Sequence, residues 1–480
     1  MFIRRSLEAK KFLKLGPNYL LKRNSQQSAT KIEYNLQTVF SYNKEKKPQK
    51  DPLVKSLLVG KFDNEFFGPL ETQTHERFRE FCKWMMPIEN YMWSCADSKE
   101  KLNKEEVLSH LRELEVFRAH VGEPYGLNLL ETESLKLMET LSTVPWVATF
   151  LVKNHIKPLQ ILSKYGSENQ KLEYFPKIIS GEFIPAICLT ESANGTNINN
   201  INSLAVANKE GMWTLNGKKT FVVNGTDSNL FLVFARNVAQ NEFSPTAFSL
   251  FLVERDDKTV TCDNVYKSIS RHEIPVCTVS FNDAVIPEKN VIGEVGCSLD
   301  TLMESLVPGN QNIDAQAISI LRNFMNQLTL DTLEMKHFDR EFYQFDAVKK
   351  VLADMSFSLY TMESMAYFTS GLTDLYENQD VQLERIITEL YCADQCLKHI
   401  QAGLKLMGTQ SYLNNNSYIQ AFHDALCLLT LDMNNIDANV YVATVALQYC
   451  ATFVHGDVYK KRNFLLYYIK IGSKIMFLFS

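Results

Sequence analysis

Apolar residues recur three and four positions apart over residues 52–185, the spacing that places them on one face of an α-helix. The stretches THERFREFCKWMMPIENYMWSC and ESLKLMETLSTVPWVATFLVKNH show this most clearly. Polar and charged residues occupy many of the positions between. The pattern predicts an N-terminal helical domain over residues 52–185.

The pattern changes over residues 186–295. Short runs rich in Val, Phe and Thr, such as NLFLVFARN and AFSLFLVER, are typical of β-strands. Asn216-Gly217 and Asn224-Gly225 are dipeptides that favour tight turns between strands. We therefore expect a central β-domain, closed into a β-barrel.

Helical spacing returns over residues 297–455, where Pro and Gly become scarce after Gly309. Long uninterrupted helices of this kind pack into bundles. The chain is thus predicted to be an α+β multidomain protein with an N-terminal helical domain, a central β-barrel domain and a C-terminal helical bundle.

The two ends of the chain have a different make-up. Residues 1–30 contain seven Lys and Arg but a single acidic residue, Glu8, with hydrophobic residues between the charges. This composition predicts a mitochondrial transit peptide over residues 1–40, and hence a protein of the matrix or of the matrix face of the inner membrane; a disordered basic tail is the alternative. Residues 456–480 form a basic, aromatic tail, either an element that associates with the inner-membrane surface or an unstructured end.

Charge and cysteine content exclude several function classes. The net charge of -5 over 480 residues gives no basic field for nucleic acid. The ten cysteines contain no CxxC pair, which favours free thiols in a reducing compartment over disulfides. Cys392, Cys396 and His399 would share one helical face, but we interpret them as packed core residues and assign no metal site.

Two segments of the predicted β-domain carry the chemistry. They read CLTESANGTN at 188–197 and LNGKKTFVVNG at 215–225. Here the sequence resembles the acyl-CoA dehydrogenase family, whose corresponding patterns are Leu-Thr-Glu-x-x-x-Gly-Ser-Asp and Lys-x-Trp-Ile-Thr-Asn. The likeness runs from about residue 52 to residue 455, and the helical segment MESMAYFTSGL at 362–372 is similar to the branch that contains very-long-chain acyl-CoA dehydrogenase and its relative in complex I assembly.

The resemblance implies a homodimeric flavoprotein that holds FAD and acts on a fatty acyl-CoA. A carboxylate would remove the α-proton while the β-hydride passes to the flavin, and electrons would then go to electron-transfer flavoprotein. In the first segment the matching cofactor residues are Leu189, Thr190, Glu191 and Gly195, while Thr196 and Asn197 replace the Ser-Asp pair.

Other positions depart further from the family pattern. Phe221 replaces the Trp that lies against the flavin, and Val223 replaces a Thr whose hydroxyl would bond to the ring. Met335 replaces a phosphate-binding Arg, and Lys349 replaces a Gln that contacts the cofactor across the dimer. Gly408 is the glycine kept from a glycine-rich segment, here MGTQSY at 407–412.

The family's catalytic Glu-Gly-Thr falls on Asp432, Met433 and Asn434. Asp432 is therefore the candidate base, one methylene shorter than Glu, and Asn434 is a candidate cofactor contact. Some branches supply the base from an earlier helix, but the matching stretch VPGNQNID at 307–314 has no acid at that position. Asp314, about a turn away, is expected to lie on a solvated helix face.

Two functions remain open from the sequence. The first is FAD-dependent α,β-dehydrogenation of long-chain fatty acyl-CoA in mitochondria. The second is a catalytically degenerate homologue that serves as a binding or assembly protein, for example for respiratory complex I. The departures at the base and at the cofactor contacts favour a degenerate site.

Overall fold

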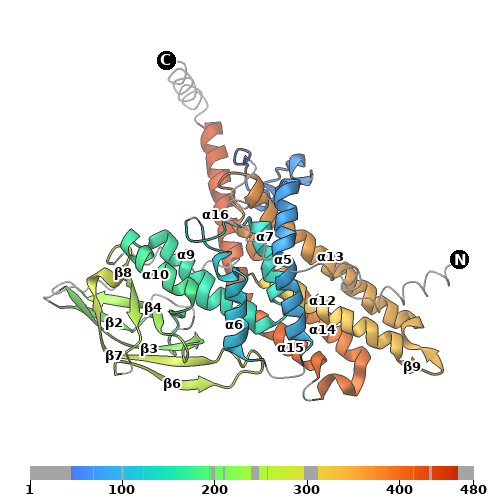
Figure 1. The fold of residues 1–480 in the computed structure, drawn as a ribbon. Helices are drawn as coiled ribbons and strands as arrows, with labels where there is room; N and C mark the ends of the chain where they lie inside the picture. Colours follow the sequence, from blue (N-terminus) through green and yellow to red (C-terminus); the bar gives the residue numbers. More distant parts are fainter. Residues whose placement is uncertain are drawn as a thin grey trace.

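The computed structural model arranges the chain as helices, a sheet and a second set of helices (Figure 1). The first helices are α4 (Leu53–Leu58), α5 (His75–Ala96), α6 (Lys104–Glu113), α7 (Glu131–Leu141), α8 (Pro145–Leu151), η3 (Val152–Ile156), α9 (Lys157–Tyr165) and α10 (Glu168–Ser180). The structure describes residues 45–68, 70–98, 102–122, 124–193, 195, 200–208, 211–238, 248–256, 258–296, 312–413, 416–431 and 435–462.

Local sequence signals set the ends of these helices. Thr74 begins α5 by accepting a hydrogen bond from the Arg77 amide. At α10 the Ser167 hydroxyl accepts from the Gln170 amide, while the Gln170 side chain accepts from the Ser167 amide. Gly181 ends α10 at a φ of 80°, a left-handed conformation that favours glycine.

One segment of the first helical region is a π-helix rather than an α-helix. This segment, η3, continues α8 into α9 and contains Asn154 and His155, both buried. The Asn154 amide donates to the Pro185 carbonyl at 2.9 Å and to the Val223 carbonyl at 3.1 Å. The π-helix therefore joins the helical region to the sheet.

The strands are β1 (Pro185–Cys188), β2 (Leu204–Ala207), β3 (Met212–Val223), β4 (Leu230–Val238), β5 (Phe248–Glu254), β6 (Val260–Tyr266), β7 (Val276–Pro287) and β8 (Val291–Ile292). Their order is β6-β7-β3-β2-β4-β5-β8, and β1 pairs in parallel with β4 beside β2. The predicted β-domain is confirmed, but the closed barrel is wrong. β6 pairs with β7 and β8 pairs with β5, so that the two edges of the sheet do not meet.

β4 has a core on each of its faces. Phe231, Val233 and Ala235 face the interior of the curved sheet, whereas Leu230, Leu232 and Phe234 face α9 and α10. Because every one of these residues is buried, the strand reads as a continuous apolar run rather than as an alternating pattern. Figure 1 shows α9 and α10 lying over this side of the sheet.

The C-terminal helices are α12 (Ile313–Glu334), α13 (Asp346–Leu375), α14 (Gln382–Met407), α15 (Ser417–Leu428) and α16 (Asn435–Arg462); a small hairpin, β9 (Lys336–His337) and β10 (Arg340–Glu341), follows α12. The predicted helical bundle is confirmed. Its core is continuous with that of the first helices, because buried residues of α5, α7 and α8 pack in one cluster with those of α12 to α15. Within the described chain no helix is long and apolar enough to cross a membrane.

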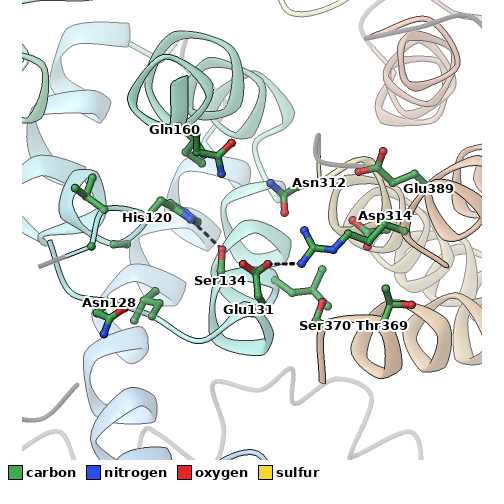
Figure 2. Close-up of a pocket in the computed structure, with 17 residues that line it drawn as sticks. His120, Asn128, Glu131, Ser134, Gln160, Asn312, Asp314, Thr369, Ser370 and Glu389 are labelled. Atoms are coloured by element: carbon green, nitrogen blue, oxygen red, sulfur yellow. Dashed lines mark hydrogen bonds and ion pairs between the residues drawn. The ribbon is translucent and has the colours of Figure 1, made fainter. Parts of the chain in front are cut away.

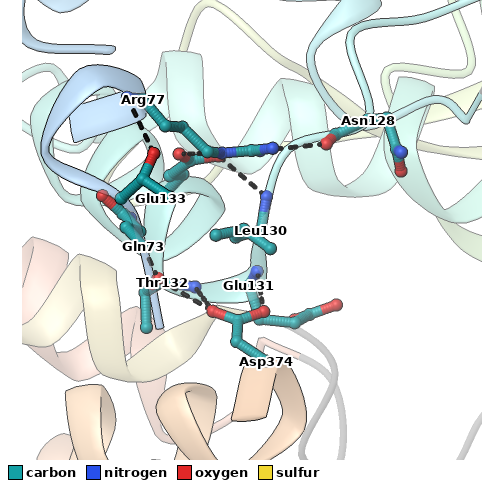
Figure 3. A network of polar contacts seen from close by, with 9 residues as sticks. Gln73, Arg77, Asn128, Leu130, Glu131, Thr132, Glu133 and Asp374 are labelled. Atoms are coloured by element: carbon teal, nitrogen blue, oxygen red, sulfur yellow. Dashed lines mark hydrogen bonds and ion pairs between the residues drawn. The ribbon is translucent and has the colours of Figure 1, made fainter. Parts of the chain in front are cut away.

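A polar network connects the two helical regions at the start of α7 (Figure 3). Arg77 and Glu133 form a fully buried, bidentate ion pair, with N–O distances of 2.7 and 2.6 Å. Asp374, at the end of α13, accepts hydrogen bonds from the amides of Glu131 and Thr132 and from the Thr132 hydroxyl. Side chains far apart in the sequence thus satisfy the free amides that begin α7.

Replacement of Arg77 by Met should leave the Glu133 carboxylate buried without its cation. We expect the free energy of unfolding to fall by about 3–5 kcal/mol, measured by urea denaturation. Arg79→Met is the matched control, because Arg79 lies on the same helix with an exposed side chain. Equal midpoints for the two variants would contradict this role of the pair.

Candidate functional site

The segment that follows β1 is held by a buried ion pair. The Glu191 carboxylate accepts hydrogen bonds from Lys219 Nζ at 2.9 Å, from the amides of Asn202 and Ser203, and from the Ser203 hydroxyl at 2.6 Å. Lys219 is fully buried and also donates to the Leu189 carbonyl. Burial alone would raise the pKa of Glu191, but Lys219 and Ser203 lower it overall, so the carboxylate stays charged.

This ion pair defines what Glu191 contributes to the site. Its oxygens are directed to the protein's own groups, and they fix the chain on both sides of the 192–201 segment. Thr190, one residue earlier, accepts a hydrogen bond from the Thr220 amide at 2.8 Å. The end of β3 is therefore locked beside residues 189–191, and Leu189 packs against the core beneath α9 and α10.

Phe221 extends from this locked strand as an exposed aromatic surface. Pairing between β3 and β7 shifts register between Lys219 and Val222, which is the signature of a β-bulge. Phe221 lies within the bulge at a φ of 56° and its side chain is 62% exposed. Its ring stacks on Tyr266 of β6 with a centroid separation of 5.0 Å and an interplanar angle of 28°.

Val223 turns toward the helices instead. Its side chain packs against the helical core, and its carbonyl accepts from the Asn154 amide of η3. The hydroxyl expected at this position by family resemblance is absent, and the backbone oxygen is already bonded.

The candidate cofactor residues on the C-terminal helices make local contacts. Lys349 is an exposed residue of α13 and pairs with Asp346 at 3.2 Å. Gly408 ends α14 at a φ of 60°, where a side chain would meet no atom within 4 Å. Met335 is half-buried and packs against the helical core, so it offers no charge to a phosphate.

Some of the predicted site residues lie outside the described residues. These are Thr196 in the segment after β1, and Asp432 and Asn434 between α15 and α16. Gly195 is described and has a φ of 48°. The role of Asp432 as the base therefore stays a prediction.

A polar cavity of about 160 Å³ lies where the two helical regions meet (Figure 2). Side chains from several elements line it, among them His120, Gln160, Asn312, Asp314, Thr369 and Glu389. His120 bonds to the Ser134 hydroxyl at 2.9 Å, and burial lowers the pKa of its imidazole to about 4, so the ring is neutral at pH 7. Arg385 pairs with Glu131 at 3.1 Å along one wall of the cavity.

The structure contradicts the expected position of Asp314. It does not lie on a solvated helix face but lines this cavity at the start of α12. Its carboxylate accepts from the Ala315 amide at 2.8 Å, and burial raises the pKa of the group. No local signal predicts this position, because the other residues that line the cavity come from the segment 119–129 and from α7, η3, α9, α13 and α14.

The cavity and the Phe221 surface lie on different sides of η3. Asn154 of this π-helix bonds to the sheet beside Val223, while Ile156 lines the cavity. Cys392 and Cys396 lie fully buried on α14 nearby, as predicted, and His399 is nearly so.

Comparison with known proteins agrees with this architecture. The N-terminal, middle and C-terminal domain models of acyl-CoA dehydrogenase match residues 70–182, 186–284 and 299–432. The chain belongs to the acyl-CoA dehydrogenase family.

Several members of the family are similar over most of the chain. The mitochondrial very long-chain specific acyl-CoA dehydrogenase of Mus musculus is 26% identical over 81% of this chain, and the Homo sapiens protein is 25% identical over 83%. The chain spans 61% and 63% of the lengths of those two relatives. Isobutyryl-CoA dehydrogenase of Dictyostelium discoideum is 26% identical over 66% of the chain and 76% of its own length.

Solved structures of the family share the fold. Butyryl-CoA dehydrogenase from Megasphaera elsdenii matches with a TM-score of 0.70 at 18% identity, over 79% of this chain and 99% of that one. A glutaryl-CoA dehydrogenase from Mycobacterium smegmatis, solved in complex with FADH2, gives a TM-score of 0.68 at 16% identity, over 79% of this chain and 97% of that one.

Three residues around this family's flavin-facing segment were not identified from the sequence. The sequence contains a signal for Lys219, because two adjacent lysines in a strand point to opposite faces and one of them must point inward. Tyr266 and Asn154 had none, because each meets the site only through the fold of a distant element.

Replacement of Asp314 by Asn should stabilise the protein at neutral pH. A carboxyl whose pKa is raised by folding stabilises the fold below its unfolded pKa and loses that contribution as pH rises through the folded value. Asn keeps the acceptor for the Ala315 amide without ionising. We expect a gain on the order of 1 kcal/mol at pH 7 that shrinks toward pH 4, measured by thermal denaturation at both values.

Asp339→Asn is the control for this experiment, because Asp339 is exposed in the turn between β9 and β10. A stabilisation by Asp314→Asn that is equal at pH 4 and pH 7 would contradict the assigned ionisation.

Proposed function

We propose that this protein is an FAD-dependent dehydrogenase of long-chain fatty acyl-CoA in mitochondria, with electron-transfer flavoprotein as its electron acceptor. The observation that carries the proposal is Phe221, an exposed ring on a bulge that the Glu191–Lys219 pair holds rigidly. Two of the relatives named above are very long-chain specific acyl-CoA dehydrogenases of mitochondria, which supports the proposed substrate class and location.

The described residues fit a bound flavin. Phe221 offers a flat surface backed by Tyr266, of the kind on which an aromatic ring system stacks. Gly195 and Gly408 have left-handed φ values, and no atom of the described residues lies within 4 Å of a Cβ built at either position, which lets the backbone approach a ligand closely. Bound FAD would supply the hydride acceptor.

The chain's own residues would place the substrate and move its proton. In this proposal the Asp432 carboxylate takes the α-proton of the acyl thioester, and the side chain of Phe221 would hold the flavin ring in position. Lys219 and Glu191 act indirectly. Their ion pair fixes the contact between Thr190 and Thr220, and with it the position of Phe221.

A second candidate function rests on Val223 and Met335. The first lacks the hydroxyl for the flavin, and the second is an uncharged, half-buried residue packed against the helical core where the family has a phosphate-binding Arg. A homologue with these changes would keep the fold but use its surface for binding or assembly in mitochondria, for example with respiratory complex I.

The first test is the visible absorption spectrum of the purified full-length chain, followed by palmitoyl-CoA without oxygen. We expect a flavin band that bleaches, and a loss of bleaching rate of roughly a hundredfold or more in Asp432→Asn. A protein that stays colourless when FAD is supplied would rule out the dehydrogenase and leave the binding function.

Replacement of Phe221 by Ala tests the flavin surface directly. Loss of the stacking ring should weaken FAD binding roughly tenfold, the equivalent of about 1.4 kcal/mol, in a fluorescence titration. Phe78→Ala is the matched control, since Phe78 is 55% exposed but lies on α5. Equal affinity in both variants would place the flavin elsewhere.

A further inference from the structure

Two cysteines meet beneath the turn that follows Phe221. Cys262 lies on β6 and is partly exposed, whereas Cys277 lies on the neighbouring strand β7 and is fully buried. In the pairing of these strands Cys262 lies opposite Val279, and its side chain is on the same face as Cys277 two residues away. Both sulfur atoms lie against the same residue, Gly225.

Gly225 makes room for the two sulfur atoms. A Cβ at Gly225 would lie 2.6 Å from Cys277 Sγ, so a larger residue there would collide with the buried thiol. The Gly225 carbonyl accepts from Cys262 Sγ at 3.3 Å. The pair therefore sits in a pocket that this glycine shapes.

Arg255 gives the pair an electropositive neighbour. Its guanidinium lies 3.7 Å from Cys262 Sγ and also donates to the carbonyls of Gly225, Thr226 and Ser228. These bonds hold the cation in place beside the sulfur. A fixed cation favours thiolate over thiol.

The two thiols differ in the ease of losing a proton. The neighbouring Cys277 thiol, and then Arg255, lower the pKa of the Cys262 thiol, while burial and Asp263 oppose the change. The neighbouring Cys262 and burial raise the pKa of Cys277. Cys262 is thus the nucleophile of the pair and Cys277 the group that stays protonated.

We propose that Cys262 and Cys277 form an oxidisable dithiol, in which Cys262 reacts with a hydroperoxide and Cys277 then closes a disulfide. This inference does not depend on the proposed function. A partly exposed, activated thiol beside a second cysteine is the arrangement that favours such chemistry over irreversible oxidation.

The reaction balances with hydrogen peroxide as the oxidant. The Cys262 thiolate attacks one peroxide oxygen, the S–O bond forms, the O–O bond breaks and the departing hydroxide takes a proton to give water. Cys277 sulfur then attacks Cys262 Sγ, the S–O bond breaks, and the leaving hydroxide takes the Cys277 proton to give a second water. Two thiols are oxidised by two electrons and one peroxide is reduced.

Oxidation would change the bonding of the turn over residues 224–228. The disulfide has no S–H group, so the Gly225 carbonyl would lose the hydrogen bond that the Cys262 thiol donates, and Arg255 would no longer have an ionisable sulfur beside it. This turn directly follows Phe221 and Val223, so the redox state of the pair acts on the end of β3.

Cys82 offers a test that separates activation from simple exposure. It is an exposed cysteine on α5, and burial together with Glu89 raises the pKa of its thiol. If exposure decided reactivity, Cys82 would react first. With limiting hydrogen peroxide and a dimedone trap, peptide mass mapping of the folded chain should instead find Cys262 oxidised, as dimedone adduct and disulfide counted together, roughly tenfold faster than Cys82.

Two variants identify the order of the steps. In Cys277→Ser the dimedone adduct should accumulate at Cys262, because no second thiol can displace it. In Cys262→Ser, Cys277 should stay reduced under the same exposure. The untreated and oxidised wild-type chains should differ by the loss of two hydrogens, restored by dithiothreitol.

Faster oxidation of Cys82 than of Cys262 in the wild-type chain, with adduct and disulfide counted together, would overturn the proposal, as would an oxidised chain whose disulfide joins other cysteines. Both results come from the wild-type protein and so do not require either variant to fold. Dimedone at Cys262 without any disulfide would overturn the role of Cys277.

Discussion

The buried pair of Glu191 and Lys219 is the constraint on which the candidate site depends. A charged amine without solvent contact is tolerable only when its charge is paired and its N–H groups are bonded, and here one carboxylate and one carbonyl accept two of its three N–H groups. The same carboxylate fixes Asn202 and Ser203, so that three separate chain segments share one charge centre. The left-handed conformation of Phe221 persists because its neighbours in the strand cannot move.

The sheet and the two helical regions depend on one another to bury their apolar surfaces. β4 is covered on one face by the curved sheet and on the other by α9 and α10, while α12 to α15 complete the core of the first helices. Neither helical region therefore buries its apolar surface alone. The Asp374 contact with the start of α7 adds a polar link between the same two regions.

Periodicity was enough to predict the order of helices, sheet and helices, because each type of element carries its own spacing of apolar residues. It was not enough to decide between a barrel and an open sheet, since both bury one face of every strand and differ only in whether β6 and β8 pair. Asp314 was misplaced for a related reason. It was expected on a solvated helix face because it misses the position of a catalytic acid, and the cavity that it lines is formed by residues of other elements. Strand alternation could have predicted the inward direction of Lys219. The Phe221–Tyr266 stack could not be predicted, because it depends on a bulge for which the local sequence contains no signal.

The π-helix η3 has one more residue per turn than the helices it joins in α8 and α9. Such a segment behaves as an α-helix that has accepted a one-residue insertion. A sequence that lost one residue between Val152 and Ile156 could regain regular α-helical geometry, and α9 would keep nearly its present orientation relative to α8, because four residues of α-helix turn through about the same angle as five of π-helix. Leu159 and Leu162 would then stay in the core under β4, but the bulge that carries Asn154 to the Val223 carbonyl would be lost. The extra residue of the π-helix therefore serves the link between the helices and the sheet rather than the packing of α9.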